Sequence, residues 1–324
     1  MSVELLPYSP LEHARQVLAL WDEALGSHYP IAERIFWSHT IGHLGYEPGD
    51  GVVAVDGGHV VGFALAQVDR LSSGQPPRGG PAALMVAPSW RRRGIGRDLL
   101  TSVSNRALSA GVREVFVGGA SLWRFWPGIP TDLSGAQEFF AACGYTLHPP
   151  CADLVRDVSN FEMPARCAEA LAREGVVVKA ASEDSVARVL AFERQTFAGW
   201  EPAFRLSAVV DADHLLVAWH GDEIVGTQQV FSPQARFRGA NVVWERLLGS
   251  DVGGIGAVGI APSWRGHGLG LALVAAGCEI LRQRGVRQCV IDWTNLVDFY
   301  GKLGFRVWRT YRMATLPVPQ QDSA

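Results

Sequence analysis

Hydrophobic and polar positions follow the same order in the two halves of the chain. Each half opens with a short apolar run and a segment of helical periodicity, expected at Val3–Leu6 and Leu11–Leu25, and at Val176–Lys179 and Glu183–Phe197. Alternating runs on either side of an Asp/Gly-rich turn then predict a β-hairpin in each half. The hairpins are Gly51–Val55 with His59–Val68, and Leu215–Trp219 with Glu223–Phe231.

Each hairpin leads into the same series of elements: an apolar strand, a long helix, a second strand and a short aromatic helix. They are expected at Ala82–Val86, Gly94–Ala110, Glu114–Val117 and Gly135–Cys143, and again at Gly256–Ile260, Gly268–Arg284, Gln288–Asp292 and Leu296–Leu303. Apolar residues recur at helical spacing in both long helices, and a glycine follows each helix, Gly111 or Gly285. One arrangement of strands and helices is therefore predicted twice.

The clearest repeat lies where the apolar strand turns into the long helix. VAPSWRRRGIG begins at Val86 and IAPSWRGHGLG begins at Ile260, and seven of the eleven aligned positions are identical. The offset, 260 − 86 = 174 residues, is too long for a solenoid and indicates duplicated domains. We expect domains at 1–162 and 163–324, with a helical connector over Pro164–Glu174.

Composition and charge exclude several classes of protein. With 48% hydrophobic and 19% charged residues among 324, each half can bury a normal core. A net charge of −3 argues against a nucleic-acid partner. No apolar stretch reaches the roughly 20 residues of a membrane span, and no signal peptide is visible. Five scattered cysteines lack zinc-site spacing, so we expect no metal, a cytoplasmic protein, and a monomer or homodimer.

The repeated Arg-x-x-Gly-x-Gly has the chemistry of a phosphate cradle. The first turn of a helix leaves about four N–H groups without partners, and glycines allow an anion to approach them. Cationic side chains add charge at Arg91, Arg92 and Arg93 in the first copy, and at Arg265 and His267 in the second. The pattern is neither a Walker loop nor Gly-x-Gly-x-x-Gly.

This strand–motif–helix unit, followed by an aromatic helix ending in Gly-Phe or Gly-Tyr, resembles the GNAT family of acetyltransferases, twice over the chain. The resemblance implies an α/β fold with a mixed sheet in two tandem GNAT domains, splayed open to hold acetyl-CoA. Carried over, cofactor contacts fall on Leu84, Met85, Val86, Arg91, Arg92, Arg93, Gly94, Ile95, Gly96 and Arg97, and on Val258, Gly259, Ile260, Arg265, Gly266, His267, Gly268, Leu269, Gly270 and Leu271. The alternative is that the glycines serve only a tight turn.

The resemblance also makes the two copies unequal. In IDWTNLVDFYGKLGF, Tyr300 stands where the family has the phenol that protonates the CoA sulfur, and Asn295 where it has a cofactor-binding amide. The alternatives are a half-buried helix aromatic and a helix N-cap. Phe140 replaces the tyrosine in AQEFFAACGY. We expect the second copy to be catalytic, and the first to bind acetyl-CoA without turnover or to use another acid.

The general base is less specified, because Gly256–Ile260 contains no carboxylate. The candidates are Asp292, Glu245 and His220, and each could instead be a surface or satisfied polar residue. The first copy also has a Trp/Pro-rich insertion, LWRFWPGIPTDLSG, because Gly94 to Gly144 spans 50 residues and Gly268 to Gly304 spans 36, a difference of 14. The insertion is either a functional loop or a flap with two packed tryptophans.

The resulting hypothesis is an N-acetyltransferase that acts on a small-molecule amine by direct attack in a ternary complex. Tandem members such as mycothiol synthases and amino-sugar N-acetyltransferases act on small amines. Two alternatives remain: a protein or peptide N-acetyltransferase, and a non-catalytic acetyl-CoA sensor.

Overall fold

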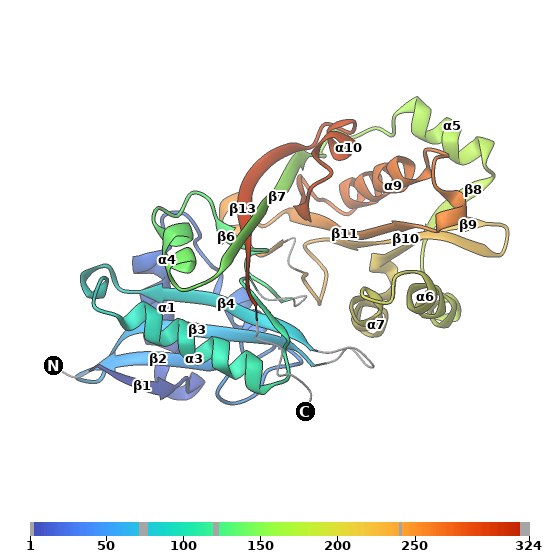
Figure 1. Ribbon diagram of the computed structural model, residues 1–324. Coiled ribbons are helices and arrows are strands. Elements are labelled where there is room, and N and C mark those ends of the chain that lie inside the picture. Colours follow the sequence, from blue (N-terminus) through green and yellow to red (C-terminus); the bar gives the residue numbers. More distant parts are fainter. Residues whose placement is uncertain (1–2, 71–76, 119–122, 240–241, 318–324) are drawn as a thin grey trace. The chain divides into compact units, whose positions relative to one another are not determined.

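The computed structural model describes residues 3–70, 77–118, 123–239 and 242–317, which form two compact units (Figure 1). Unit 1 consists of Met1–Cys151 together with Arg309–Ala324, and unit 2 of Ala152–Trp308. The expected division at 162/163 does not anticipate this arrangement, because each unit contains a strand from beyond that boundary.

Unit 1 has a mixed six-stranded sheet with the order β1-β2-β3-β4-β5-β13, in which only β4 and β5 are parallel. A two-stranded contact of β6 with β13 lies beside it. Its elements are β1 (Glu4–Pro7), α1 (Pro10–Ala24), α2 (Glu33–His39), β2 (Gly51–Asp56), β3 (His59–Asp69), β4 (Arg78–Val86), the 3₁₀ turn η1 (Pro88–Trp90), α3 (Ile95–Ser109), β5 (Glu114–Phe116), β6 (Ile129–Pro130), α4 (Ala136–Ala142) and the adjoining parts of β7 (Thr146–Asp157) and β13 (Arg306–Pro317).

Unit 2 repeats this plan with the order β7-β12-β11-β10-β9-β8, and only β11 and β12 are parallel. Its elements are α5 (Ala165–Arg173), β8 (Val176–Ala180), α6 (Glu183–Thr196), α7 (Glu201–Val210), η2 (Ala212–His214), β9 (Leu215–His220), β10 (Glu223–Phe231), α8 (Glu245–Leu248), β11 (Val252–Ile260), η4 (Pro262–Trp264), α9 (Leu269–Gln283), β12 (Gln288–Thr294) and α10 (Val297–Gly301).

The sheet of unit 2 separates two layers of helices (Figure 1). The helices α5, α9 and α10 pack on one face around Val274, Cys278 and Tyr300. The helices α6 and α7 cover the other face around Val189, Phe204 and Val217. Because the apolar side chains of successive strand residues alternate between faces, both layers receive a core from the same strands.

The last strand of each unit comes from a distant part of the chain. In unit 1, β13 pairs antiparallel with β5, so that Thr315 lies opposite Phe116. In unit 2, β7 pairs antiparallel with β12, so that Leu154 lies opposite Ile291. Leu154 and Tyr311 are fully buried, so the exchanged strands contribute to both cores.

A fragment of residues 1–162 should therefore fail to form a stable unit 1. It lacks β13, which leaves β5 as an unpaired edge and removes Tyr311 and Ala314 from the core. We expect no cooperative thermal unfolding by circular dichroism. The same fragment with 306–317 restored through a flexible linker serves as the control. Cooperative unfolding of both at one temperature would contradict the expectation.

The helices of the described chain are all too short or too polar to cross a bilayer.

Candidate functional site

The loop of the repeated Arg-x-x-Gly-x-Gly motif has the same backbone shape in each unit. In unit 2, Gly266 and Gly268 have φ values of 86° and 84°, and Gly268 is the N-cap of α9. In unit 1, Arg92 and Gly94 have φ values of 65° and 88° before α3. In these described segments, no side chain caps either helix, which leaves first-turn N–H groups directed at an incoming anion.

The first arginine of each motif braces the loop. Arg265 Nε donates to the carbonyl of Ile260 at 3.1 Å, and Arg91 Nε donates to Val86 at 3.1 Å. Arg93 also turns back, to the carbonyl of Ser89 at 3.1 Å. The expected cofactor role of these arginines stays a prediction, because the contacts seen maintain the loop from which backbone N–H groups project.

His267 lies in an ion-pair network at the same loop. Its Nδ1 is 3.1 Å from a carboxylate oxygen of Glu174, and its carbonyl accepts from Arg173 at 2.9 Å. The pKa of Glu174 is lowered, first by its hydrogen bond from Arg173 and then by His267. The loop of unit 2 is thus held by the last residue of α5, Arg173, and by its C-cap, Glu174.

The strand that leads into the loop of unit 2 separates from its parallel partner β12, because both strands continue after their last paired residues, Ile255 and Ile291. Pairing of β11 with β12 covers Val252–Ile255, and Gly256–Ile260 continues past it. A bulge opposite Thr227–Gln229 accompanies Ala257, whose φ is 47°. A Cβ on Gly259 would lie 2.4 Å from the ring of Phe197, so only glycine fits there.

Backbone strain is concentrated beside this splayed segment. Among the described residues, the non-glycine residues with positive φ are Arg92, Ala257 and Trp293. Ala257 and Trp293 lie near the ends of β11 and β12, and the N–H of Trp293 donates to Asp153 at 3.0 Å. Such conformations cost about 1–3 kcal/mol each and cluster at functional sites.

Tyr300 lies on α10 directly after β12, and its side chain is buried against aromatic neighbours. The rings of Phe299 and Phe305 lie 5.0 and 6.2 Å from its ring, both edge to face. Burial, and then the charge of Asp292, raise the pKa of Tyr300 to about 12. The structure thus places Asp292 near enough for its charge to affect Tyr300, whose phenol stays protonated at neutral pH.

The other predicted residues of unit 2 do not join this group. Glu245 forms a 2.7 Å ion pair with Arg238, and both side chains are almost fully buried. His220 is exposed and lies 4.9 Å from the ring of Trp264. Asn295 is exposed at a bend, and the helix N-cap is Leu296, whose N–H donates to Thr294. The alternative of Asn295 as the N-cap is therefore wrong.

Unit 1 has a cleft but lacks the phenol. A small cleft of about 70 Å³, open to solvent, is lined by Leu84, Trp126, Ile129 and Phe140 beside β4. Phe140 occupies the position that matches Tyr300 and contacts Tyr145 edge to face at 5.3 Å. The expectation that unit 2 is the catalytic copy stays a prediction, and the hydrocarbon side chains of Leu84, Ile129 and Phe140 in this cleft cannot supply a proton.

The insertion of unit 1 is packed rather than projecting, apart from Leu122, which lies outside the described residues. Trp123 and Trp126 are each 6% exposed. The ring of Trp126 stacks on Trp21 at 5.4 Å and 5°. Trp126 and Ile129 also form part of the cleft wall, so the insertion shapes that space.

Sequence reasoning missed a buried carboxylate, Glu193 on α6. Its side chain is 0% exposed, and one carboxylate oxygen accepts from the hydroxyl of Thr227. Its second oxygen, Oε2, is buried without a hydrogen-bond partner. Burial raises the pKa of Glu193 to about 7. Glu193 and Leu20 occupy matching positions of the two units, because each lies eleven residues after a helix N-cap, Ser182 or Ser9. A glutamate in one copy that matches a leucine in the other was the signal that the repeat contained.

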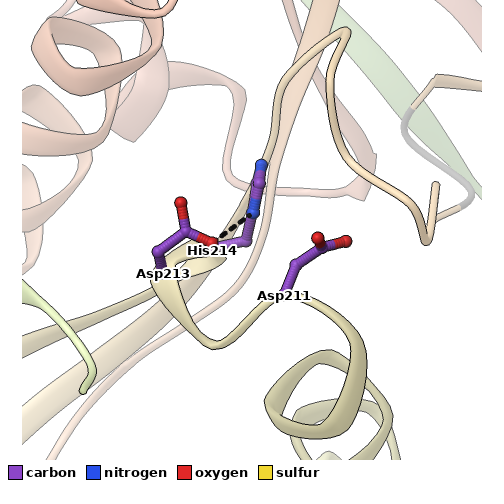
Figure 2. Close-up of side chains that lie close together, drawn as sticks. All are labelled: Asp211, Asp213 and His214. Atoms are coloured by element: carbon purple, nitrogen blue, oxygen red, sulfur yellow. Dashed lines mark hydrogen bonds and ion pairs between the residues drawn. The ribbon is translucent and has the colours of Figure 1, made fainter. Parts of the chain in front are cut away.

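One group in the described chain has metal-ligand composition, Asp211, Asp213 and His214 (Figure 2). Protein groups contact all three side chains. Asp211 accepts the N–H groups of 236 and 237, Asp213 pairs with Arg284, and the His214 nitrogens contact Asp213 and Ser232. These contacts connect η2 to the segment that follows β10.

Comparisons with known proteins agree with this geometry. The model of the Acetyltransferase (GNAT) family matches residues 14–127 and 181–305. A mycothiol acetyltransferase of Amycolatopsis mediterranei (strain U-32) is 29% identical over 281 residues, which cover 80% of this chain and 82% of that protein. One from Tsukamurella paurometabola is 28% identical and covers 92% of this chain and 94% of that protein.

Solved structures give the same result for the fold. A GCN5-related glucosamine N-acetyltransferase region of a fungal multi-domain GH3 β-N-acetylglucosaminidase matches 97% of this chain with a TM-score of 0.90 and 25% identity. This chain spans 38% of that protein. A tandem GNAT protein from the clavulanic acid biosynthesis pathway has a TM-score of 0.62 at 19% identity, covering 97% of this chain and 98% of that one.

Proposed function

Because the chain belongs to the acetyltransferase (GNAT) family and is therefore an acyltransferase, we propose that unit 2 acetylates the primary amine of a small molecule. Acetyl-CoA is the donor, and the amine attacks its thioester directly in a ternary complex. The supporting observation is that unit 2 combines an uncapped helix N-terminus, at Gly268, with a protonated phenol, Tyr300, beside a splayed strand.

Each of these features has a role in the proposed reaction. The N–H groups after Gly268 would bind the pyrophosphate, supported by the helix dipole. The edge of Val258–Ile260 that faces away from β10, beyond the pairing with β12, would pair with the pantetheine arm as an added strand does. Tyr300 would donate its proton, or a hydrogen bond, to the departing thiolate, whose own pKa is about 8.5.

Unit 1 is proposed to bind acetyl-CoA without turnover. It has the same loop geometry at Gly94 and a cleft beside β4, but Phe140 provides no proton. We also propose a cytoplasmic protein, in keeping with the cysteines, all free thiols. Oligomeric state stays a prediction of monomer or homodimer.

The acceptor is proposed to be an amine carried on a sugar or a similarly small polar molecule. The relatives support this class, because they include mycothiol acetyltransferases and a glucosamine N-acetyltransferase region. No deep acidic trough for a basic peptide is needed for such a substrate.

The test is acetyl transfer from acetyl-CoA to a panel of free amines and amino sugars, with histone-like and ribosomal peptides in parallel. We expect turnover with at least one small amine, measured as thiol release and as a mass increase of the acceptor. Turnover on peptides alone would overturn the small-molecule assignment. Thiol release independent of every amine would overturn amine acetylation.

A further inference from the structure

We propose that Glu193 is the general base of unit 2, which takes the proton from the acceptor's ammonium group. This inference rests on the proposed function and adds a residue to it. It differs from the expectations for Asp292, Glu245 and His220.

The first support is position. Thr227, which donates to Glu193, lies opposite Gly259 in the β10–β11 register. Phe197, one helical turn after Glu193, lies against the same glycine. The carboxylate therefore lies beneath the segment of β11 that is no longer paired with β12, on the face that α6 covers.

Tyr300 approaches from the other face, because α10 packs with α9 in the opposite core. A thioester placed at the splayed strand would have the phenol on one side of the sheet and the carboxylate on the other. That separation gives each group its own task, because the carboxylate can face the incoming amine while the phenol faces the departing sulfur.

The second support is the unsatisfied oxygen of Glu193. Burying a carboxylate oxygen without a hydrogen bond costs free energy, so its presence calls for a ligand or a catalytic role. An acceptor ammonium would supply the missing donor at Oε2. The charged groups nearby are Glu201 and its partners Arg194 and Arg205, which pair with Glu201 rather than Glu193.

The third support is the other unit. The residue that matches Glu193 is Leu20, from equal spacing to the helix N-caps. The residue that matches Thr227 is Phe63. Phe63 pairs with Met85, and Thr227 pairs with Gly259. Met85 and Gly259 are equivalent residues of the repeat, because they are 174 residues apart. Both counterparts are buried and apolar. The fold thus accepts hydrocarbon at these positions, and the polar pair occurs in the unit that also carries the tyrosine.

The proposed step is balanced in atoms and charge. The ammonium proton passes to Oε2 of Glu193, and the freed lone pair of the amine forms the new C–N bond at the thioester carbon. The C–S bond then breaks, the thiolate takes a proton from Tyr300, and the phenolate takes back the second proton that the new C–N nitrogen must lose, so that the net proton released is the one held by Glu193. A base with a pKa near 7 suits this exchange at neutral pH.

Glu193→Gln tests the proposal, using the amine identified by the acceptor panel. The amide keeps the size of the side chain and the bond from Thr227, but it cannot accept a proton. We expect kcat to fall about 100-fold at pH 7, with an unchanged Kd for acetyl-CoA by calorimetry. In the wild type, kcat/KM should fall below about pH 7 as Glu193 becomes protonated, and this acid limb should vanish in the variant.

Glu201→Gln provides a second test, whose readout is the pH at which the acid limb lies. A purely structural role of Glu193 would not move that pH. The charge of Glu201 contributes to the raised pKa of Glu193, so its removal should move the acid limb to lower pH while the plateau rate stays the same. Wild-type rate and an unchanged profile in Glu193→Gln would overturn the role of Glu193 alone. A wild-type enzyme that acetylates no amine would overturn the proposed function and this role with it.

Stability separates loss of function from loss of fold. The pKa of Glu193 in the folded state lies above the roughly 4.3 of a free glutamate. Its contribution to the free energy of unfolding is therefore fully present below about pH 4.3 and is lost as the pH rises through about 7. Glu193→Gln should therefore unfold at the same or a higher temperature than the wild type at pH 8. A lower unfolding temperature there would assign Glu193 a structural role instead.

Discussion

Replacing Gly268 with valine should reduce acetyl transfer about 1,000-fold, through loss of acetyl-CoA binding in unit 2. Gly268 has a φ of 84°, where a β-branched residue is strained by roughly 1–2 kcal/mol. An added Cβ would also lie 3.3 Å from Ala170 on α5. Distortion at this N-cap would also displace the first-turn N–H groups that are proposed to bind the pyrophosphate, and the loss of that anion contact adds to the strain.

Gly94→Val is the matched control, because Gly94 has a φ of 88° at the same position of unit 1. Calorimetric titration of the wild type with acetyl-CoA should show two sites. Each variant should lose one, and only Gly268→Val should lose turnover. If Gly94→Val were the inactive variant, the assignment of chemistry to unit 2 would be wrong. If the wild type showed a single site, one of the two loops would not bind the cofactor.

Tyr300→Phe should reduce kcat about 1,000-fold while leaving the Kd for acetyl-CoA unchanged. The change removes one oxygen from a ring held between Phe299 and Phe305, so packing is retained. Because the pKa of Tyr300 is raised to about 12, its ionisation should not limit the wild-type rate anywhere from pH 6 to 9. Single-turnover kinetics would show whether the loss lies in the chemical step.

The reverse substitution, Phe140→Tyr, is the control in unit 1. It restores the phenol but not the counterparts of Glu193 and Thr227, which are Leu20 and Phe63. We expect no gain of activity when it is combined with Tyr300→Phe. Recovery of turnover in that double variant would mean that the phenol alone separates the two units. An unchanged rate in Tyr300→Phe over pH 6–9 would remove Tyr300 from the mechanism.

Local patterns predicted most elements because each carries its own signal. Apolar and polar residues alternate in the hairpin strands β2, β3, β9 and β10. The helices α3 and α9 each begin after a glycine whose positive φ marks the turn before the helix. The sequence did not predict α2 and α7, since short helices between loops bury few residues and have weak periodicity. The exchange of β7 and β13 was also missed, because strand pairing between distant segments leaves no local trace.

The candidate site was predictable where a motif is continuous in the chain, as in Gly266–Gly270 and around Tyr300. Glu193 was missed because one glutamate on an amphipathic helix looks like any solvent-facing residue. Its burial is decided by the contact of α6 with β10, which brings Thr227 onto it. Comparing the two units position by position, beyond the motif, would have found it as a charge opposite a leucine.

The exchanged strands set the order in which the protein can be completed during synthesis. Unit 2 receives β7 before the ribosome makes β12, so it can close as soon as its own residues emerge. Unit 1 must wait for β13. At about 5–20 residues per second, the ~200 residues between Phe116 and Thr315 take on the order of 10–40 s. During that interval the edge of β5 stays open, so the half that is made first is the half that matures last.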